Sequence, residues 1–329
     1  MFDIITIGGA SRDVFFMTDE GRVINDVRHH EKLIAFDYGC KIIPKESEFT
    51  YGGGAANTAA CFAKLGLSVA TIMNIGAEGT GSLVVKYLEA EGVSTSFVTR
   101  DHVNHTAMSI IIGLPGQDHT MFLYRGSNDH LTIHDWRPLR TKWFYLSSLT
   151  GASADIIPEL FSFARAHNIK IAWNPGSEQL VGGYEDLSSF LEETDILILN
   201  REEAQQLLLS KDKKVKVNDE KILLSGLSAM VQGKVVITDG ANGSYVKDGI
   251  NEYHQEALGD QVLETTGAGD AYGATFVAAE LLGYGTKYAM KLAALNSGSV
   301  VRYIGAQKGL LTFSILSAII DSRKSITEN

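Results

Sequence analysis

Residues 195–209 read DILILNREEAQQLLL, and this stretch contains the unit from which the fold is predicted. Asp195–Leu199 is apolar almost throughout, which is typical of a strand buried on both faces. A polar cluster follows, and Glu202–Leu209 then has the spacing of a helix. A strand that passes directly into a helix is the repeating unit of an α/β fold.

The same order recurs along the chain. Further apolar strands are predicted at Ile4–Ile7, Val69–Ile75, Trp143–Leu146, Lys170–Trp173 and Lys234–Thr238. Helices are predicted at Ala55–Leu65, Gly81–Glu91, Asp155–His167, Ser225–Val231, Ala271–Leu282 and Lys287–Val301. Ala271–Leu282 is apolar on most faces, as a buried helix is. Lys247-Asp248-Gly249 predicts a hairpin within Ser244–His254. The expected fold class is therefore α/β, with a mainly parallel central sheet covered by helices on both faces.

Two stretches, about 14–50 and about 95–125, lack the spacing of apolar residues that predicts helices. Their alternating residues and turn signals predict strands. We expect them to form a small antiparallel sheet that projects from the main layer as a lid. The alternative is that they are edge strands of the main sheet. Because a lid made from two insertions does not fold independently, residues 1–329 are predicted to form a single domain.

Composition excludes several classes of protein. The 329 residues are 45% hydrophobic and 21% charged, with a net charge of −10, unlike disordered or collagen-like chains and unlike nucleic-acid-binding proteins. No apolar run approaches the roughly 18 residues of a membrane span. Asp3 stands where a secretory signal carries Lys or Arg, so a cytoplasmic protein is expected. Cys40 and Cys61 lie in unrelated contexts and are predicted to be free thiols.

The sequence TTGAGDA at residues 265–271 directly precedes the predicted buried helix. Small residues allow successive backbone N–H groups to face one anion, and the helix start adds about half a positive charge. A carboxylate here, Asp270, would repel a phosphate unless it held a hydroxyl beside it, so the motif favours phosphoryl transfer to an alcohol. The alternative is that Asp270 only caps the helix. No Walker loop is present, and the glycines lack the strands of a dinucleotide fold.

A second glycine run, YGGGAANT at residues 51–58, opens a predicted helix. Glycines let a bound molecule approach the backbone closely, and Asn57 offers both a donor and an acceptor to hydroxyl groups. Asp13 follows the first strand, where ligands bind in such sheets. The alternatives are an ordinary loop before a helix and a solvated aspartate.

Polar clusters also follow two later strands. Asn200 and Glu203, one helical turn apart, are candidates for a site that faces Mg²⁺ and phosphate oxygens. The sequence TDGANG at residues 238–243 ends the next strand. Each cluster has the alternative interpretation of a helix cap or a turn.

Taken together, these motifs resemble the ribokinase-like, PfkB-type carbohydrate kinase family over essentially the whole chain. The family's two hallmark patterns match at residues 52–57 and 265–272, its Asn-x-x-Glu pattern matches at Asn200 and Glu203, and Thr-x-Gly-x-x-Gly matches at Thr238, Gly240 and Gly243. The resemblance implies a three-layer α/β/α fold with a small β lid that in many members also forms a dimer contact.

The resemblance also implies ATP-dependent transfer of the γ-phosphate, with the following roles. The base would be Asp270, and the anion hole would be supplied by Gly267, Ala268 and Gly269. The acceptor would be held by Asp13, Gly52, Gly53 and Asn57, and the nucleotide would lie along Asn200, Thr238, Gly240, Gly243 and Asn296. Glu203 would act through Mg²⁺. Many relatives also bind a monovalent cation such as K⁺ near a Gly-Ala-Gln segment, which matches here at residues 305–307, although Glu264 replaces a common Asp and Gly309 a hydroxyl residue.

The expected activity is that of a sugar kinase, and a nucleoside kinase is the alternative within the same chemistry. Phe15, Phe16, Phe36 and Tyr38 are candidates to stack on a base, although alternating aromatic residues in a strand are more often core. A non-catalytic sugar sensor is disfavoured because a sensor needs no base at Asp270. Arg125, beside the lid, is expected either to meet an anionic acceptor or to pair with a surface glutamate, and the second is preferred.

Overall fold

The computed structural model describes residues 1–26, 31–115, 119–259 and 261–327. The strands are β1 Phe2–Ile7, β2 Ser11–Met17, β3 Arg22–Asp26, β4 Glu31–Ala35, β5 Glu46–Gly52, β6 Val69–Ile72, β7 Asn74–Gly76, β8 Thr99–Asp101, β9 Ala107–Gly113, β10 His119–Tyr124, β11 Thr141–Leu146, β12 Lys170–Trp173, β13 Ile196–Asn200, β14 Lys234–Thr238, β15 Ser244–Asp248 and β16 Asn251–Gln255. The α-helices are α1 Gly54–Lys64, α2 Gly79–Ala90, α3 Ile157–His167, α4 Ser177–Val181, α5 Gly183–Glu192, α6 Arg201–Lys211, α7 Glu220–Ser228, α8 Ala268–Leu281, α9 Thr286–Val300 and α10 Phe313–Thr327.

A large sheet forms the centre of the molecule, with the strand order β16-β15-β14-β13-β12-β11-β1-β6. The pairs from β14 through to β6 are parallel, whereas β15 and β16 form an antiparallel hairpin at one edge. This arrangement confirms the predicted fold class. The predicted strand at Val69–Ile75 is divided, because β6 stays in the large sheet and β7 pairs with β8.

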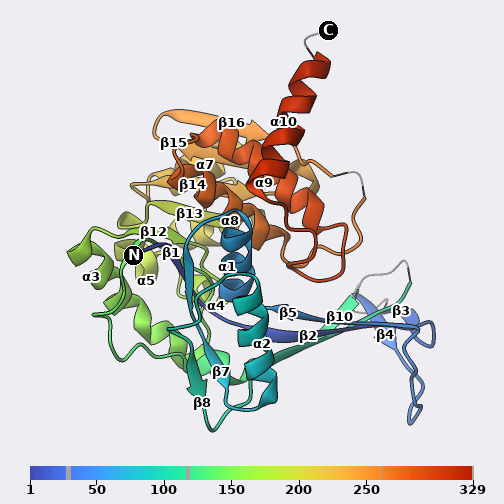
Figure 1. Cartoon of the computed structure of the whole chain (residues 1–329). Coiled ribbons are helices and arrows are strands. Elements are labelled where there is room, and N and C mark those ends of the chain that lie inside the picture. The colour runs from blue at the N-terminus through green and yellow to red at the C-terminus, as the bar shows by residue number, and fades with distance from the viewer. Residues whose placement is uncertain (27–30, 116–118, 260, 328–329) are drawn as a thin grey trace.

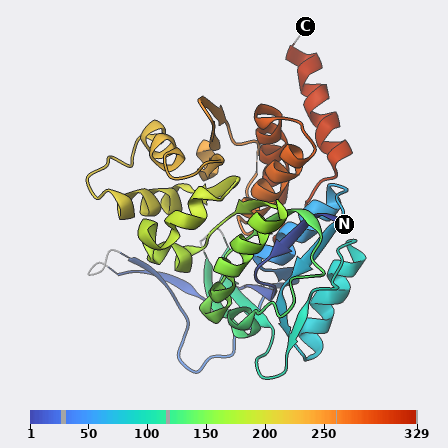
Figure 2. The same ribbon diagram turned by 90° about the vertical axis from the view of Figure 1, so that its left-hand side faces the viewer.

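Helices cover both faces of this sheet (Figures 1 and 2). Successive side chains of a strand point to opposite faces, so Ile4 joins one hydrophobic core and Ile5 and Ile7 join the other. Side chains of α1, α2, α8, α9 and α10 line the first core, and those of α3, α5, α6 and α7 line the second. The result is the three-layer arrangement.

Helix α8 is buried on nearly all sides, as its sequence predicts. Residues 271–279 are all buried, and the helix packs against α1 and α9. The helix begins at Ala268, three residues before the predicted start, so Asp270 lies in its first turn.

A separate sheet with the order β10-β9-β2-β5 projects from the body (Figure 1). We call this sheet, with the β3–β4 hairpin, the lid. The prediction of an antiparallel sheet is wrong in one respect, because β2 and β9 are parallel. Both strands lead outward from the body and lie side by side, whereas β5 and β10 bring the chain back. Residues 95–106 are not in the projecting sheet, and residues 27–30 and 116–118 lie outside the described residues.

Other expectations need correction at the level of single helices. The helix predicted at Ser225–Val231 is α7, which begins earlier because the Asp219 side chain caps it by accepting from the Lys221 and Ile222 N–H groups. Helices α4, α5 and α10 were not predicted. Cys40 and Cys61 are free, as expected. Within the described residues, no helix is both long and apolar enough to cross a bilayer.

Candidate active site

The N-terminus of α8 forms the centre of the candidate site. Gly267 is its N-cap with φ 79°, and a Cβ there would lie 2.3 Å from the Ala306 Cβ, so the position requires glycine. The Ala268 N–H donates to the Thr265 carbonyl at 3.1 Å. This bond leaves the Gly269 and Asp270 amides, in the first turn, as the donors that an anion would meet.

The Asp270 side chain does not cap its own helix. The cap position belongs to Gly267, and Asp270 Oδ2 instead accepts a hydrogen bond of 2.8 Å from the Nδ2 of Asn57 in α1. Burial raises the pKa of Asp270 to about 6, and the Asn57 hydrogen bond opposes that rise. A carboxyl group with this pKa is mostly ionised at pH 7 and can still accept a proton, as a general base must.

The three glycines before α1 bring the lid strands to this centre. A Cβ on Gly52 would lie 1.9 Å from Asp13 Oδ2, and one on Gly53, where φ is 92°, would lie 2.5 Å from the Gly9 carbonyl. A Cβ on Gly54 would be 4.0 Å from Asp270 Oδ1. The structure therefore brings together Asp13, the glycine run, Asn57 and Asp270.

Asp13 follows the first strand, as the sequence indicates, but it lies on the lid strand β2, and because only 5% of it is exposed it is not a solvated aspartate. It accepts a 2.8 Å hydrogen bond from Ser11 Oγ and a further one from Ser109, its partner on β9. Burial raises the pKa of Asp13, which the two hydroxyl groups partly offset. Sequence reasoning missed Ser109, because nothing in the sequence pairs β2 with β9.

A second group of predicted residues meets at the ends of neighbouring strands. Thr238 of β14 is the register partner of Asn200 of β13. Gly240 and Gly243 have φ values of 50° and 89°, and a Cβ on Gly243 would lie 2.0 Å from the Gln255 carbonyl. This loop leads into Ser244, whose Oγ accepts a 2.7 Å hydrogen bond from Tyr272 of α8. Tyr272 therefore connects the loop to the helix that carries Asp270.

Asn200 and Glu203 form a reciprocal cap of α6. The Glu203 N–H donates to Asn200 Oδ1 at 2.8 Å, and the Asn200 N–H donates to Glu203 Oε2 at 2.9 Å. Burial raises the pKa of Glu203. Among the described residues, no group of three or more His, Cys, Asp or Glu side chains is arranged to hold a metal ion. A Mg²⁺ ion at Glu203 would need phosphate oxygens and water as further ligands, which is the usual arrangement for this ion.

Sequence reasoning also missed Arg201. Its guanidinium donates to Glu220 at 2.7 Å and to Asp239 at 2.9 Å, which ties the start of α6 to α7 and to the loop after β14. The only sequence signal is its position directly after Asn200.

Two further predicted residues have protein partners. Asn296 is fully buried, its Nδ2 donates to Thr275 at 2.8 Å, and its Oδ1 accepts from the Leu311 N–H; that it lies along a nucleotide stays a prediction. Arg125 pairs with Glu178, as the preferred expectation for this residue states.

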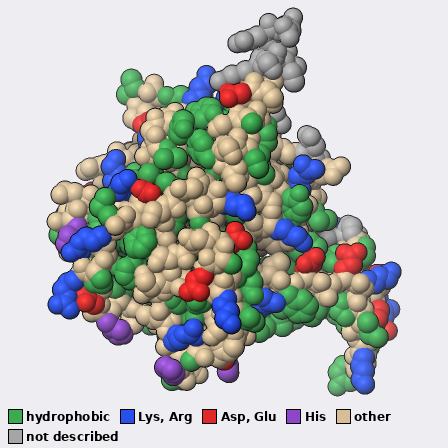
Figure 3. Space-filling view, in the orientation of Figure 1, with side chains coloured by type: hydrophobic (Ala, Val, Ile, Leu, Met, Phe, Trp, Pro, Cys, Tyr) green, Lys and Arg blue, Asp and Glu red, His purple; other side chains and the backbone are tan. Residues whose placement is uncertain are grey.

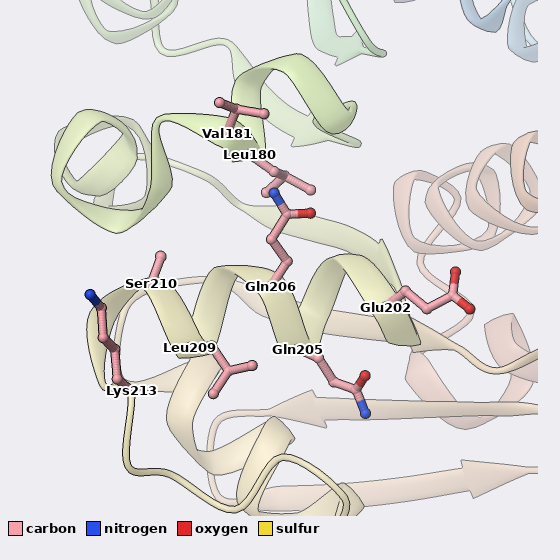
Figure 4. A pocket seen from close by; sticks show the side chains of 8 residues that line it. All are labelled: Leu180, Val181, Glu202, Gln205, Gln206, Leu209, Ser210 and Lys213. Carbon is pink, nitrogen blue, oxygen red and sulfur yellow. The ribbon is translucent and has the colours of Figure 1, made fainter. Parts of the chain in front are cut away.

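A surface hollow of about 670 Å³ lies between α4 and α6 (Figure 4). Its walls include Leu180, Val181 and Leu209, and none of the predicted site residues lines it. The hollow is therefore separate from the candidate site.

Comparisons with known proteins bear on the family and the fold of the chain. The sequence pattern of a family described as "pfkB family carbohydrate kinase" matches residues 21–312. An ATP-dependent 6-phosphofructokinase of Thermoanaerobacterium thermosaccharolyticum is 23% identical over 89% of this chain and 91% of its own. Arabidopsis thaliana ribokinase, complexed with ribose and ATP, has a similar fold with a TM-score of 0.80 at 19% identity, covering 97% of this chain and 98% of its own. A Methanocaldococcus jannaschii nucleoside kinase has a TM-score of 0.78 at 20% identity, covering 98% and 99%.

Proposed function

Because the chain belongs to the pfkB family of carbohydrate kinases, we propose that it transfers the γ-phosphate of ATP to a hydroxyl group of a sugar or sugar derivative. The observation that supports this most strongly is a half-buried carboxylate, Asp270, within the first turn of a helix whose Gly269 and Asp270 amides face the same centre. A base and an anion site side by side are what transfer to an alcohol requires.

In the proposed reaction, Asp270 accepts the proton of the acceptor hydroxyl as the phosphoryl group arrives. The Gly269 and Asp270 amides, at the positive end of α8, stabilise the charge on the transferred group. Asp13, Gly52, Gly53 and Asn57 hold the acceptor against Asp270. The buried Asp13 is fixed by Ser11 and Ser109, so it presents its oxygen atoms to hydroxyl groups in one orientation.

The nucleotide is proposed to lie along Asn200, Thr238 and the loop that contains Gly240 and Gly243. Mg²⁺ bound with ATP neutralises phosphate charge during transfer. Glu203 is the residue that would hold this ion, through water, and its Oε2 already accepts the Asn200 N–H. The chain therefore fixes the direction of the Glu203 side chain before nucleotide binds.

The test is an ADP-release assay with sugars, sugar acids and nucleosides as acceptors, with Asp270→Asn as the matched variant. Turnover with a sugar-type acceptor is expected, together with a rate at least about 100-fold lower in the variant, the scale of a lost acid–base group. Absence of ADP release with every acceptor class, or full activity of the variant, would contradict the proposal.

The structure favours a sugar over a nucleoside. Phe15 is 4% exposed, and Phe16 packs edge-on against Phe49 with ring centroids 6.4 Å apart. Tyr38 is fully exposed. These aromatic residues are therefore poorly placed to enclose a base. Faster turnover of nucleosides than of sugars in the same assay would reverse this assignment.

We further propose that the chain forms a homodimer through the outer face of the lid. The strand registers place Phe49, Phe122 and Tyr124 on the face opposite Asp13, where they are 55%, 62% and 48% exposed. Figure 3 shows hydrophobic side chains along the lid where it leaves the body. An exposed apolar face of this kind marks an association surface.

Light scattering tests the dimer. Phe122→Glu should convert a dimer of two 35.7 kDa chains into monomers, whereas Ile250→Glu, at an exposed apolar residue of the β15–β16 turn, should not. A monomeric wild type would refute the proposal.

Activation by K⁺ relative to Na⁺ at equal ionic strength tests a monovalent cation site near residues 305–307.

A further inference from the structure

The turn at residues 305–308 touches three parts of the candidate site at once. Ala306 packs on Gly267, the N-cap of α8. Gly305 packs on Thr50 of the lid strand β5, because a Cβ there would lie 2.7 Å from a Thr50 side-chain atom. Gln307 completes the set, since its Nε2 donates to Asn57 Oδ1 at 2.9 Å and approaches the Tyr51 carbonyl at 3.3 Å.

Hydrogen-bonding chemistry fixes which end of each side-chain amide faces which neighbour in the series Gln307–Asn57–Asp270. The ionised Asp270 can only accept, so the side of Asn57 that faces it must be its NH₂ group. Asn57 Oδ1 then points to Gln307, which must offer its own NH₂ group. Gln307 Oε1 is left buried, without a hydrogen-bond partner among the described residues. A buried carbonyl oxygen in this state costs stability, which argues that the orientation serves another purpose.

We propose that Gln307 is a positioning residue that holds Asn57 with its NH₂ group toward Asp270, and that it connects this hydrogen bond to the lid strand β5. The inference rests on the proposed function, in which Asp270 is the base. Because the hydrogen bond from Asn57 favours the ionised form of Asp270, the orientation of Asn57 sets how readily the base is available at neutral pH.

In the described part of the chain, two other titratable groups are close enough to Asp270 to influence it, and neither alters the effect of the Asn57 hydrogen bond. Burial raises the pKa of Cys61 in α1 to about 12 and that of Tyr145 in β11 well above its ordinary value. Both therefore remain neutral below pH 9. A change in the ionisation of Asp270 between pH 5 and pH 9 then reports on its hydrogen bond and on newly introduced charge.

Three variants separate positioning from simple structural support. Gln307→Glu places oxygen atoms against Asn57 Oδ1, so Asn57 is expected to turn its NH₂ group away from Asp270. Gln307→Met keeps the length of the side chain without the donor. Thr50→Val is the matched control at the same seam, since its hydroxyl oxygen is buried and lacks a hydrogen-bond partner in the described part of the chain.

The experiment measures the pKa of Asp270 directly, by NMR titration of the carboxyl carbon in aspartate-labelled full-length protein, with Asp270→Asn to assign the signal. Gln307→Glu should raise this pKa by about one pH unit and Gln307→Met by less, with Thr50→Val unchanged. In the ADP-release assay, the acid limb of kcat/KM should move upward with it, so that Gln307→Glu is impaired at pH 6 and recovers by pH 9.

The outcomes are distinct. An unchanged Asp270 pKa in both Gln307 variants, or a rate lowered equally at every pH, would overturn the positioning role while leaving the kinase assignment intact. Wild-type protein without phosphoryl transfer would overturn the proposed function, and the NMR titration would still decide whether Gln307 controls the Asp270 carboxyl group.

Discussion

The candidate base is expected to cost the protein stability, and Asp270→Asn measures this cost. Burial raises the pKa of Asp270 from 3.8 to about 6 in the folded state. Below pH 3.8 the carboxyl group is neutral in both the folded and the unfolded chain, so aspartate and asparagine should give similar free energies of unfolding. As the pH rises through 6, the folded state must hold a buried charge that the unfolded state exposes to water.

The size of the effect follows from the pKa difference of about two, at about 1.4 kcal/mol for each pH unit. Asp270→Asn should therefore raise the free energy of unfolding by up to about 3 kcal/mol above pH 7, while abolishing turnover. The asparagine side chain still accepts from Asn57, so the 2.8 Å hydrogen bond is retained. Urea unfolding at pH 4, 5, 6, 7 and 8 measures the difference between the two proteins.

Asp101→Asn is the control with the opposite sign. The Asp101 carboxylate accepts from the backbone of Asn104 and Val103, which lowers its pKa, so this variant should lose stability at neutral pH rather than gain it. If Asp270→Asn gave the same stability as the wild type at both pH 4 and pH 8, the raised pKa inferred for Asp270 would be wrong.

Three further predictions concern activity. With the pKa of Asp270 at about 6, kcat/KM at pH 5 should be about a tenth of its value at pH 7, and a flat profile in saturating ATP would contradict the assignment of the base. Gly52→Ala should lower kcat/KM for the acceptor by about 100-fold, mainly through KM, because its Cβ would lie 1.9 Å from Asp13 Oδ2 and displace that carboxylate. Initial rates against acceptor concentration test this. Normal acceptor binding would show that Asp13 lies outside the site. Glu203→Gln keeps the cap of α6, since glutamine also accepts the Asn200 N–H, so thermal stability should be retained. The Mg²⁺ concentration for half-maximal rate should rise about tenfold. An unchanged Mg²⁺ requirement would leave Glu203 with its capping role alone.

The central sheet could be predicted from sequence because its strands are almost wholly apolar and its helices follow directly. β12 and β14 have the predicted bounds, Lys170–Trp173 and Lys234–Thr238. The parallel pairing of β2 with β9 could not be predicted, since it joins residues about a hundred positions apart and depends on which strands leave the body together. Local patterns contain no information of that kind.

In the candidate site, too, local features could be predicted from the sequence, whereas contacts between distant residues could not. Gly267 and Asp270 could be located because a helix start that requires glycine has a local signature. The hydrogen bond from Asn57 to Asp270 and that from Gln307 to Asn57 join residues more than 200 positions apart. For Asn296, the sequence identified a polar residue in a buried helix, but only the packing shows that Thr275 and Leu311 already satisfy its side chain.

The lid meets the body near both of its ends. Its sheet strands join the body at one end, and Asp13 is the third residue of β2, close to that attachment. At the distant end, His119 Nδ1 lies 3.7 Å from Glu264 Oε2, in the loop that leads to Gly267. A rotation of the lid about its attachment would break the contact of His119 with Glu264 and move the tip far more than Asp13, so substrate could enter while the carboxylate proposed to bind it kept its position.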